Sequence, residues 1–169
     1  MQRMTSQADY IDQLGLEPHP EGGWFKETAH SEDRYFALES HGQRYRYTAI
    51  LFLLTAGNPS HFHRLNHDEL WFFHDGAPLT IHCIAPNGQY STVKLGLNLA
   101  AGEVPQFRVP RETIFASEVT APDSFGLVSC VVAPGFHYDD FELFTKNQLH
   151  RKYPKLPTVI DRLALDTID

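Results

Sequence analysis

Hydrophobic and polar residues alternate through much of the chain between residues 24 and 134, with the period of half-buried β-strands rather than of helices. The clearest case is residues 79–85 and 89–95, which flank the turn sequence Pro86-Asn-Gly88 and therefore predict an antiparallel hairpin. The same pattern predicts further strands at 24–29, 44–55, 102–110, 113–120 and 126–134. Short strands at this spacing are typical of a β-sandwich or barrel.

Helical signals are confined to the two ends of the chain. Ser6 can cap a helix that ends at Gly15, so we predict an N-terminal helix over residues 6–15. After Pro134, Asp139 or Asp140 can cap a second helix that ends before Pro154, and residues 158–165 suit one more short helix. The apolar side of the second helix would carry Phe141, Leu143, Phe144 and Leu149.

Together these elements predict an all-β protein with short helices at its N- and C-terminal ends. The 169 residues suit a single domain, with a β-barrel over about 20–134 and C-terminal helices over about 139–165. Among antiparallel architectures that hide their strand edges, the jelly roll is the one we expect. Its interior is wide enough to hold one small ligand.

Charge and cysteine content narrow the classes of partner. The chain has 14 Lys and Arg against 21 Asp and Glu, a net charge of -7, which argues against nucleic-acid and anionic-membrane binding. Cys83 and Cys130 lie in apolar runs without CxxC spacing, as buried thiols do in a reducing compartment. No signal peptide or membrane-length apolar run is present, so we expect a soluble, cytoplasmic protein with a small-molecule ligand.

The stretch from Ser60 to Gly76 concentrates the side chains that could do chemistry. In an extended strand, residues i and i+2 point to the same face, so His61 and His63 would lie side by side. Glu69 follows beyond a short turn. Two histidines and a carboxylate can hold a divalent metal such as iron, nickel, manganese or zinc, and His61, His63 and Glu69 could thus serve a metal-dependent oxygenase. Alternatively, they are hydrogen-bonded polar residues at a strand end.

Without metal, the same stretch supports acid-base chemistry. A neutral His63 is the best candidate for a general base, and Glu69 or Asp68 could orient it. Tyr138 and Tyr47 are candidate acids. Such a set would suit an isomerase or epimerase acting on a sugar or sugar-nucleotide, whereas a non-catalytic binding protein could use the same pocket.

Other residues are candidates for contacting the ligand. Arg64, Arg46 or Lys26 could bind a phosphate or carboxylate, and Glu21 or Glu27 could reach the pocket from the turn before residue 24. The remaining turn histidines, His19, His30, His41 and His150, are interpreted as surface groups. The predicted ligand-binding residues are Tyr47, Ser60, Arg64, Trp71, His74 and Phe115.

Several motifs resemble one known family. Gly57, His61, His63, Glu69 and Gly76 resemble the first motif of the cupin superfamily, although two of the gaps differ by a residue or two. Segments 19–28, 60–64, 68–71, 76–79, 133–136 and 140–143 are similar to the cupin family DUF985, over nearly the whole chain.

The resemblance carries its own expectations. It implies a jelly roll, a homodimer and a ligand pocket inside the barrel, and the family is often labelled a predicted sugar epimerase because of its fold. The chain departs from the second cupin motif, because Phe115 stands where a fourth, histidine ligand to a metal would be expected.

Overall fold

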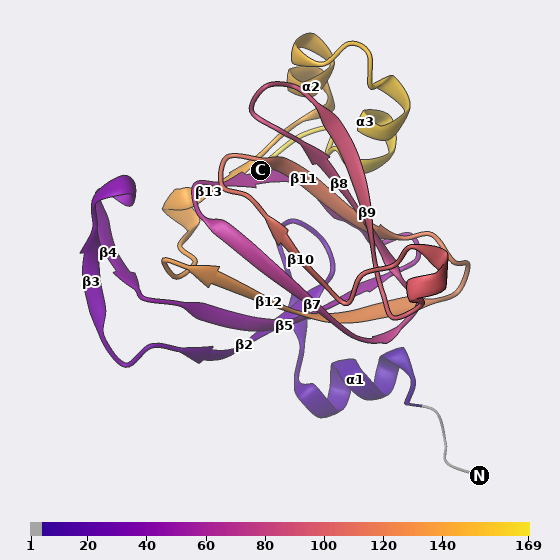
Figure 1. The fold of residues 1–169 in the computed structure, drawn as a ribbon, viewed down its shortest axis with the longest axis horizontal. Helices are drawn as coiled ribbons and strands as arrows, with labels where there is room; N and C mark the ends of the chain where they lie inside the picture. Colours follow the sequence, from indigo (N-terminus) through magenta and orange to yellow (C-terminus); the bar gives the residue numbers. More distant parts are fainter. Residues whose placement is uncertain (1–4) are drawn as a thin grey trace.

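The computed structural model describes residues 5–169 and consists mainly of two β-sheets that face each other (Figure 1). One sheet has six strands in the order β1-β2-β5-β12-β7-β10, and the other has five in the order β13-β6-β11-β8-β9. The six-stranded sheet comprises β1 (Glu17–Pro18), β2 (Trp24–His30), β5 (Thr48–Thr55), β7 (Asp68–Gly76), β10 (Gln106–Val109) and β12 (Phe125–Ala133). The five-stranded sheet comprises β6 (Ser60–Leu65), β8 (Leu79–Ile84), β9 (Tyr90–Leu95), β11 (Ile114–Val119) and β13 (Phe141–Leu143).

From β5 to β8 and again from β10 to β12, the chain passes from one sheet to the other at each strand, as in a jelly roll. All pairings between the named strands are antiparallel. The predicted hairpin is confirmed: β8 and β9 flank a turn in which the Gly88 amide donates to the Ala85 carbonyl oxygen at 2.8 Å. Gly88 has φ +84°, a conformation that glycine adopts readily.

The N-terminal helix is also confirmed. α1 (Gln7–Leu14) begins with a capping box between Ser6 and Asp9 and ends at Gly15, which has φ 64°. Its residues Tyr10, Ile11 and Leu14 pack against an apolar cluster that includes Leu53 on β5. The helix therefore covers the outer face of the six-stranded sheet.

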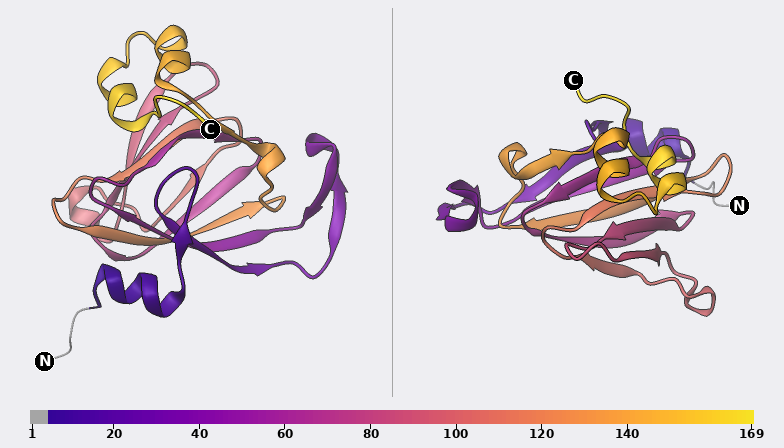
Figure 2. Two further views of the ribbon diagram at one scale, coloured as in Figure 1. Left: turned by 180° about the vertical axis from the view of Figure 1, so that it is seen from behind. Right: turned by 90° about the horizontal axis from the view of Figure 1, so that it is seen from above.

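The prediction of a helix beginning at Asp139 or Asp140 is wrong. Residues Tyr138–Asp140 form a 3-10 turn (η3), and Phe141–Leu143 pair with the edge of β6 as strand β13. The helix α2 (Lys146–Lys152) begins later because Thr145 and Gln148 form a capping box there. α3 (Pro157–Leu163) agrees with the predicted last helix, and both helices pack on the outer face of the five-stranded sheet (Figure 2).

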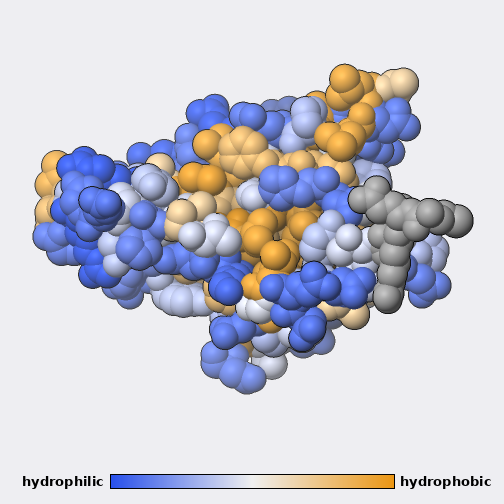
Figure 3. Space-filling model, turned by 90° about the horizontal axis from the view of Figure 1, so that it is seen from below, coloured by the Kyte–Doolittle hydropathy of each residue, from blue (hydrophilic) through white to orange (hydrophobic). Residues whose placement is uncertain are grey.

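A hairpin that the sequence pattern did not predict extends away from the sheets. It consists of β3 (Arg34–Ala37), the 3-10 turn η1 (Leu38–Ser40) and β4 (Gly42–Tyr45), and is called the arm below. On the face seen from below, the arm is mainly hydrophilic, and apolar residues gather nearer the centre of the molecule (Figure 3). The arm is joined to the barrel by Arg44, whose guanidinium forms a buried ion pair with Asp140 of η3 at 2.7 Å.

The interior between the sheets is filled unevenly. The rings of Phe52, Trp71 and Phe115 are fully buried and pack edge to face, with centroids 5.8 Å apart for Phe52 and Trp71 and 6.3 Å for Trp71 and Phe115. These three rings, called the aromatic plug below, close the middle of the barrel. Beyond them, toward β13 and η3, the interior is hollow.

Candidate functional site

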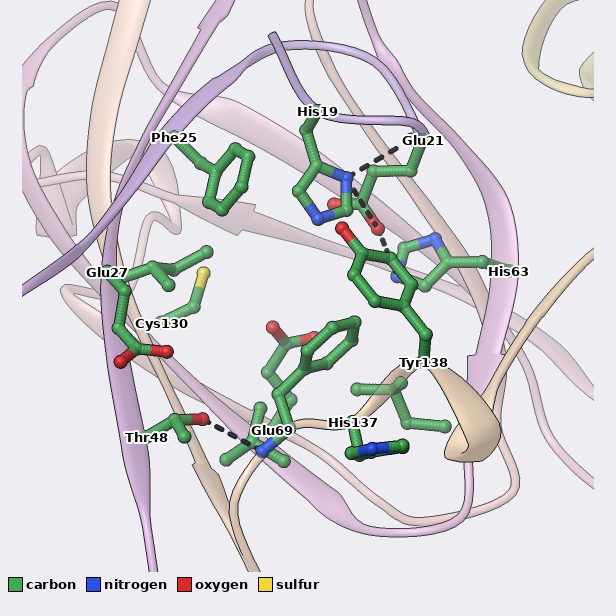
Figure 4. A pocket seen from close by; sticks show the side chains of 14 residues that line it. His19, Glu21, Phe25, Glu27, Thr48, His63, Glu69, Cys130, His137 and Tyr138 are labelled. Carbon is green, nitrogen blue, oxygen red and sulfur yellow. Dashed lines mark hydrogen bonds and ion pairs between the residues drawn. The ribbon is translucent and has the colours of Figure 1, made fainter. Parts of the chain in front are cut away.

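The hollow end of the barrel is a cavity of about 270 Å³ (Figure 4). Phe25, Ile50, Leu65, Val132 and Phe136 form much of its apolar wall, together with the thiol of Cys130. Its other titratable side chains are His19, Glu21, Glu27, His63, Glu69, His137 and Tyr138. A small apolar cavity with a few convergent polar groups is the usual form of a ligand site.

Glu21 reaches the cavity because the turn before β2 folds onto the start of β6. Gly22, at φ +107°, allows the chain to turn while its backbone lies against Pro59. The carbonyl oxygen of Glu21 accepts the backbone N–H of His61 at 2.7 Å, which fixes the turn to the five-stranded sheet. The Glu21 side chain is therefore held at a defined depth in the barrel.

Glu21 and His63 form a buried pair, with Glu21 Oε2 3.0 Å from His63 Nε2. His63 Nδ1 lies 2.7 Å from the carbonyl oxygen of His61, so Nδ1 carries the proton and Nε2 is the acceptor. Burial, followed by the neighbouring charge of Glu69, raises the pKa of Glu21 well above its usual value, and burial lowers the pKa of His63 to about 3. The pair is thus a carboxylic acid that donates to a neutral imidazole.

Glu69 approaches the cavity from β7 in the opposite sheet. Its side chain is buried, and within residues 5–169 its Oε2 atom has no hydrogen-bond partner. Burial raises the pKa of Glu69 to about 7, although the nearby Trp71 indole and Cys130 thiol favour the ionised form. Two buried carboxyl groups with raised pKa values therefore line one cavity.

His19 adds a hydrogen-bond donor. Its Nδ1 accepts the backbone N–H of Glu21 at 3.1 Å, and burial lowers its pKa to about 4, so the ring is neutral and Nε2 carries the proton. Phe25 packs against the ring with centroids 4.6 Å apart. Figure 4 shows the Nε2 side of the ring turned toward the cavity, where it can donate to an oxygen atom of a ligand.

Tyr138 lies at the mouth, on η3. Its side chain lines the cavity although the residue is 53% exposed, and Figure 4 shows its hydroxyl directed toward Glu21 and His19. Partial burial and then the charge of Glu21 raise its pKa. Tyr138 is therefore a neutral hydroxyl group placed over the Glu21–His63 pair.

Of the residues predicted to be catalytic, the structure brings His63, Glu69 and Tyr138 together at the cavity. The predicted ligand-binding residues do not line it. Ser60, Trp71 and Phe115 are buried in the surrounding core, and Phe115 packs on the His63 ring with centroids 4.1 Å apart. Tyr47 and His74 are exposed, and the guanidinium of Arg64 pairs with Glu142 on the outside of the barrel.

The residues proposed for a metal do not form a donor set. His61 is on the same strand face as His63, but its Nδ1 is 2.7 Å from the Glu21 carbonyl oxygen and it does not line the cavity. Both ring nitrogens of His63 have protein partners. The described residues contain no group of three or more His, Cys, Asp and Glu that could hold a metal ion. A metal held by His61, His63 and Glu69 does not fit this arrangement.

His19 and Glu21 are the functional residues that local patterns miss or leave open. The sequence pattern indicates a surface group at His19, and it leaves Glu21 as one of two acidic residues that could reach the pocket. The available signal is the segment His19-Pro-Glu-Gly-Gly23 itself, where two adjacent glycines permit a tight turn. The place where that turn docks depends on β6, which is far from it in sequence.

Comparisons with known proteins agree with this architecture. The model of a family described as Cupin superfamily (DUF985) matches residues 8–144. The chain belongs to this family. The DUF985 cupin is 45% identical to protein SO0799 from Shewanella oneidensis, with a TM-score of 0.89 and coverage of 97% of this chain and 100% of that one. It is 39% identical to a hypothetical protein from Leishmania major, with a TM-score of 0.88 and coverage of 95% and 99%.

This cupin is also similar to a yeast protein in sequence and to a bacterial enzyme in fold. The uncharacterized protein YML079W of Saccharomyces cerevisiae is 30% identical over 176 residues, which cover 95% of this chain and 85% of the yeast protein. Bacillus subtilis oxalate decarboxylase OxdC shares the fold, with a TM-score of 0.57 at 11% identity, over 90% of this chain and 38% of that one. The described part of this cupin contains no helix long and apolar enough to cross a membrane.

Glu69 should leave a signature in the pH dependence of stability. Its folded pKa of about 7 lies above the ordinary value of 4.5, so the unfolded chain loses this proton first and stability falls as pH rises from 4.5 to 7. Glu69→Gln lacks this titration. The unfolding free energy of the variant minus that of wild type should therefore rise by about 3 kcal/mol as the pH increases from 4.5 to 8. Urea denaturation across this range measures the difference, and a constant difference would show that Glu69 titrates normally.

Proposed function

We propose that this cupin binds a small hydroxylated carbonyl compound in its barrel and moves a proton at the carbon beside the carbonyl group, as a sugar isomerase or epimerase does. The observation that carries the proposal is the pair of buried carboxyl groups, Glu21 and Glu69, that line one cavity. Acid-base chemistry requires one group that accepts a proton and another that returns it.

The environments of the two carboxyl groups indicate which one accepts the proton and which one donates it. Glu69, with a pKa of about 7, can be ionised near neutral pH and accept a proton from carbon. The negative charge of Glu69 then favours the protonated form of Glu21, which is the group that can donate. Because both ring nitrogens of His63 are engaged and its Nε2 accepts the Glu21 proton, we assign His63 the orientation of Glu21 rather than direct contact with the substrate.

Other groups in the cavity suit the negative charge that develops on the substrate in this reaction. When a proton leaves the carbon beside a carbonyl group, the electron pair moves onto the carbonyl oxygen, which becomes an enolate. The neutral His19 can stabilise that oxygen through its Nε2–H group. Phe25 and Phe136 provide flat apolar surfaces against the carbon skeleton.

Solvent deuterium exchange tests the proposal. Wild-type protein is incubated in D₂O with a panel of aldoses and ketoses, and deuterium at the carbon beside the carbonyl group is followed by NMR. We expect exchange with at least one sugar and a loss of about a hundredfold in its rate for Glu69→Gln.

Glu27→Gln is the matched control, because Glu27 also lines the cavity but its side chain is 49% exposed. Its rate should remain within a few-fold of wild type, on the order expected for an exposed position away from the reacting atoms. A protein that binds a sugar but never exchanges its proton, in wild type and Glu69→Gln alike, would be a non-catalytic binding protein.

A further inference from the structure

We propose that the cavity admits an uncharged, monosaccharide-sized ligand and keeps phosphate and carboxylate groups outside the barrel. This inference rests on the proposed function and specifies its substrate class, namely free sugars rather than sugar phosphates, uronic acids or the phosphate-bearing part of a nucleotide sugar. It rests on the charged groups that line the cavity and on the partners of the cations around it.

The wall of the cavity carries three carboxyl groups, Glu21, Glu27 and Glu69, and none of the described lining residues is lysine or arginine. His19 and His63 are neutral there and supply no positive charge. An anionic group that entered would lose its hydration without gaining a cation, and it would lie beside an ionised Glu69. The electrostatic field of the cavity therefore opposes an anion.

The nearby cations are turned away or already engaged. Phe25 and Glu27 line the cavity, so Lys26 between them faces the other side of β2. Arg44 donates two hydrogen bonds to Asp140, at 2.7 and 3.0 Å, and a third to the Gln43 carbonyl oxygen.

One further cation lies near the mouth. Arg34 lines a separate depression that borders the mouth at Phe136 and His137, where its guanidinium donates to the Tyr45 hydroxyl at 2.8 Å. An anionic group of a longer ligand could lie in that depression but not in the cavity.

The volume of the cavity supports the same class. A volume of about 270 Å³ is slightly below the usual lower bound of drug-sized ligand sites, about 300 Å³. One sugar ring suits this space better than a sugar with a nucleotide attached.

Matched ligand pairs test the inference. Binding of glucose, fructose, mannose and xylose at pH 7.5 is compared by calorimetry with that of glucose 6-phosphate, fructose 6-phosphate and glucuronate. We expect at least one neutral sugar to bind tenfold or more tighter than each anionic compound, and Glu69→Gln to narrow this ratio. Equal or tighter binding of an anionic compound, or no binding of any neutral sugar, would overturn the inference.

The same panel separates this inference from the proposed function. A neutral sugar that binds without deuterium exchange would overturn the proposed proton transfer and leave the charge selection standing. An anionic sugar that binds tightly and exchanges would overturn the charge selection and leave the proton transfer standing.

Discussion

Replacing Gly22 with alanine is expected to lower the free energy of unfolding by on the order of 3 kcal/mol or more and to abolish ligand binding. A Cβ atom at this position would lie 2.0 Å from the Pro59 carbonyl oxygen, and φ is +107°, a conformation that alanine disfavours. To relieve the clash the turn must leave β6, and Glu21 and His19 must move with it. The expected fall in Tm is roughly 6–12 °C.

Gly57→Ala is the matched control for this change. Gly57 also has positive φ, +84°, but a Cβ atom added at this position would have no group of the described chain within 4 Å beyond its immediate neighbours. It should cost only the backbone strain, about 1–2 kcal/mol, and leave binding intact. Thermal and urea denaturation, with sugar binding measured on both variants, compare the two. Equal losses would mean that the contact with Pro59 does not hold the turn.

Replacing Asp140 with asparagine should cost about 3–5 kcal/mol, because it leaves the Arg44 guanidinium buried without a negative partner. The two side chains are only 4% and 3% exposed, and asparagine keeps the shape of the carboxyl group while removing its charge. Asn66 donates to the same carboxylate at 3.2 Å. We expect the arm, which carries Arg44, and η3, which carries Asp140, to loosen together.

The exposed pair Arg46–Asp33 is the control, with side chains 59% and 57% exposed. Asp33→Asn should change the free energy of unfolding by less than about 1 kcal/mol.

The pH dependence of the Asp140→Asn effect provides a second test of the ion pair. Burial raises the pKa of Asp140, but the hydrogen bonds from Arg44, Ser40 and Asn66 and the charge of Arg44 together outweigh burial, so the net pKa is lowered. Its contribution is present above the unfolded pKa and lost as pH falls through the folded one. Denaturation should therefore show a smaller effect of Asp140→Asn in acid; an unchanged effect would contradict the ion pair.

Local pattern is sufficient for most of the strands, because alternation records which face of a strand is buried. It fails at residues 139–143, where the acidic residues resemble a helix start, yet Phe141–Leu143 gain hydrogen bonds by pairing with β6. It also misses the arm. The strands of the arm are exposed or half-buried on most of their length, so the period of hydrophobicity that marks a strand is weak there.

The candidate site is predictable in part. His63 and Glu69 lie on barrel strands, where alternation determines the face, and both reach the cavity as predicted. For His74 and Tyr47, residue type alone supports a place in the pocket, and the structure leaves both exposed. The contribution of His19 and Glu21 depends on how a glycine turn docks against a distant strand. Docking of this kind depends on contacts between residues that are far apart in the sequence, and the local pattern of hydrophobic residues does not reveal such contacts.

The aromatic plug sets the depth of the cavity. Phe115 touches the His63 ring, and Trp71 follows the cavity-lining Glu69 by two residues on β7, so both side chains pack directly behind residues that line the cavity. Barrel length is fixed by the strands, but the length of the hollow depends on which of these rings is present. Replacing one of these rings with a smaller side chain would extend the cavity toward the middle of the barrel without rearranging Glu21 and Glu69. The size of the rings in the aromatic plug thus determines how long a ligand the same fold can hold.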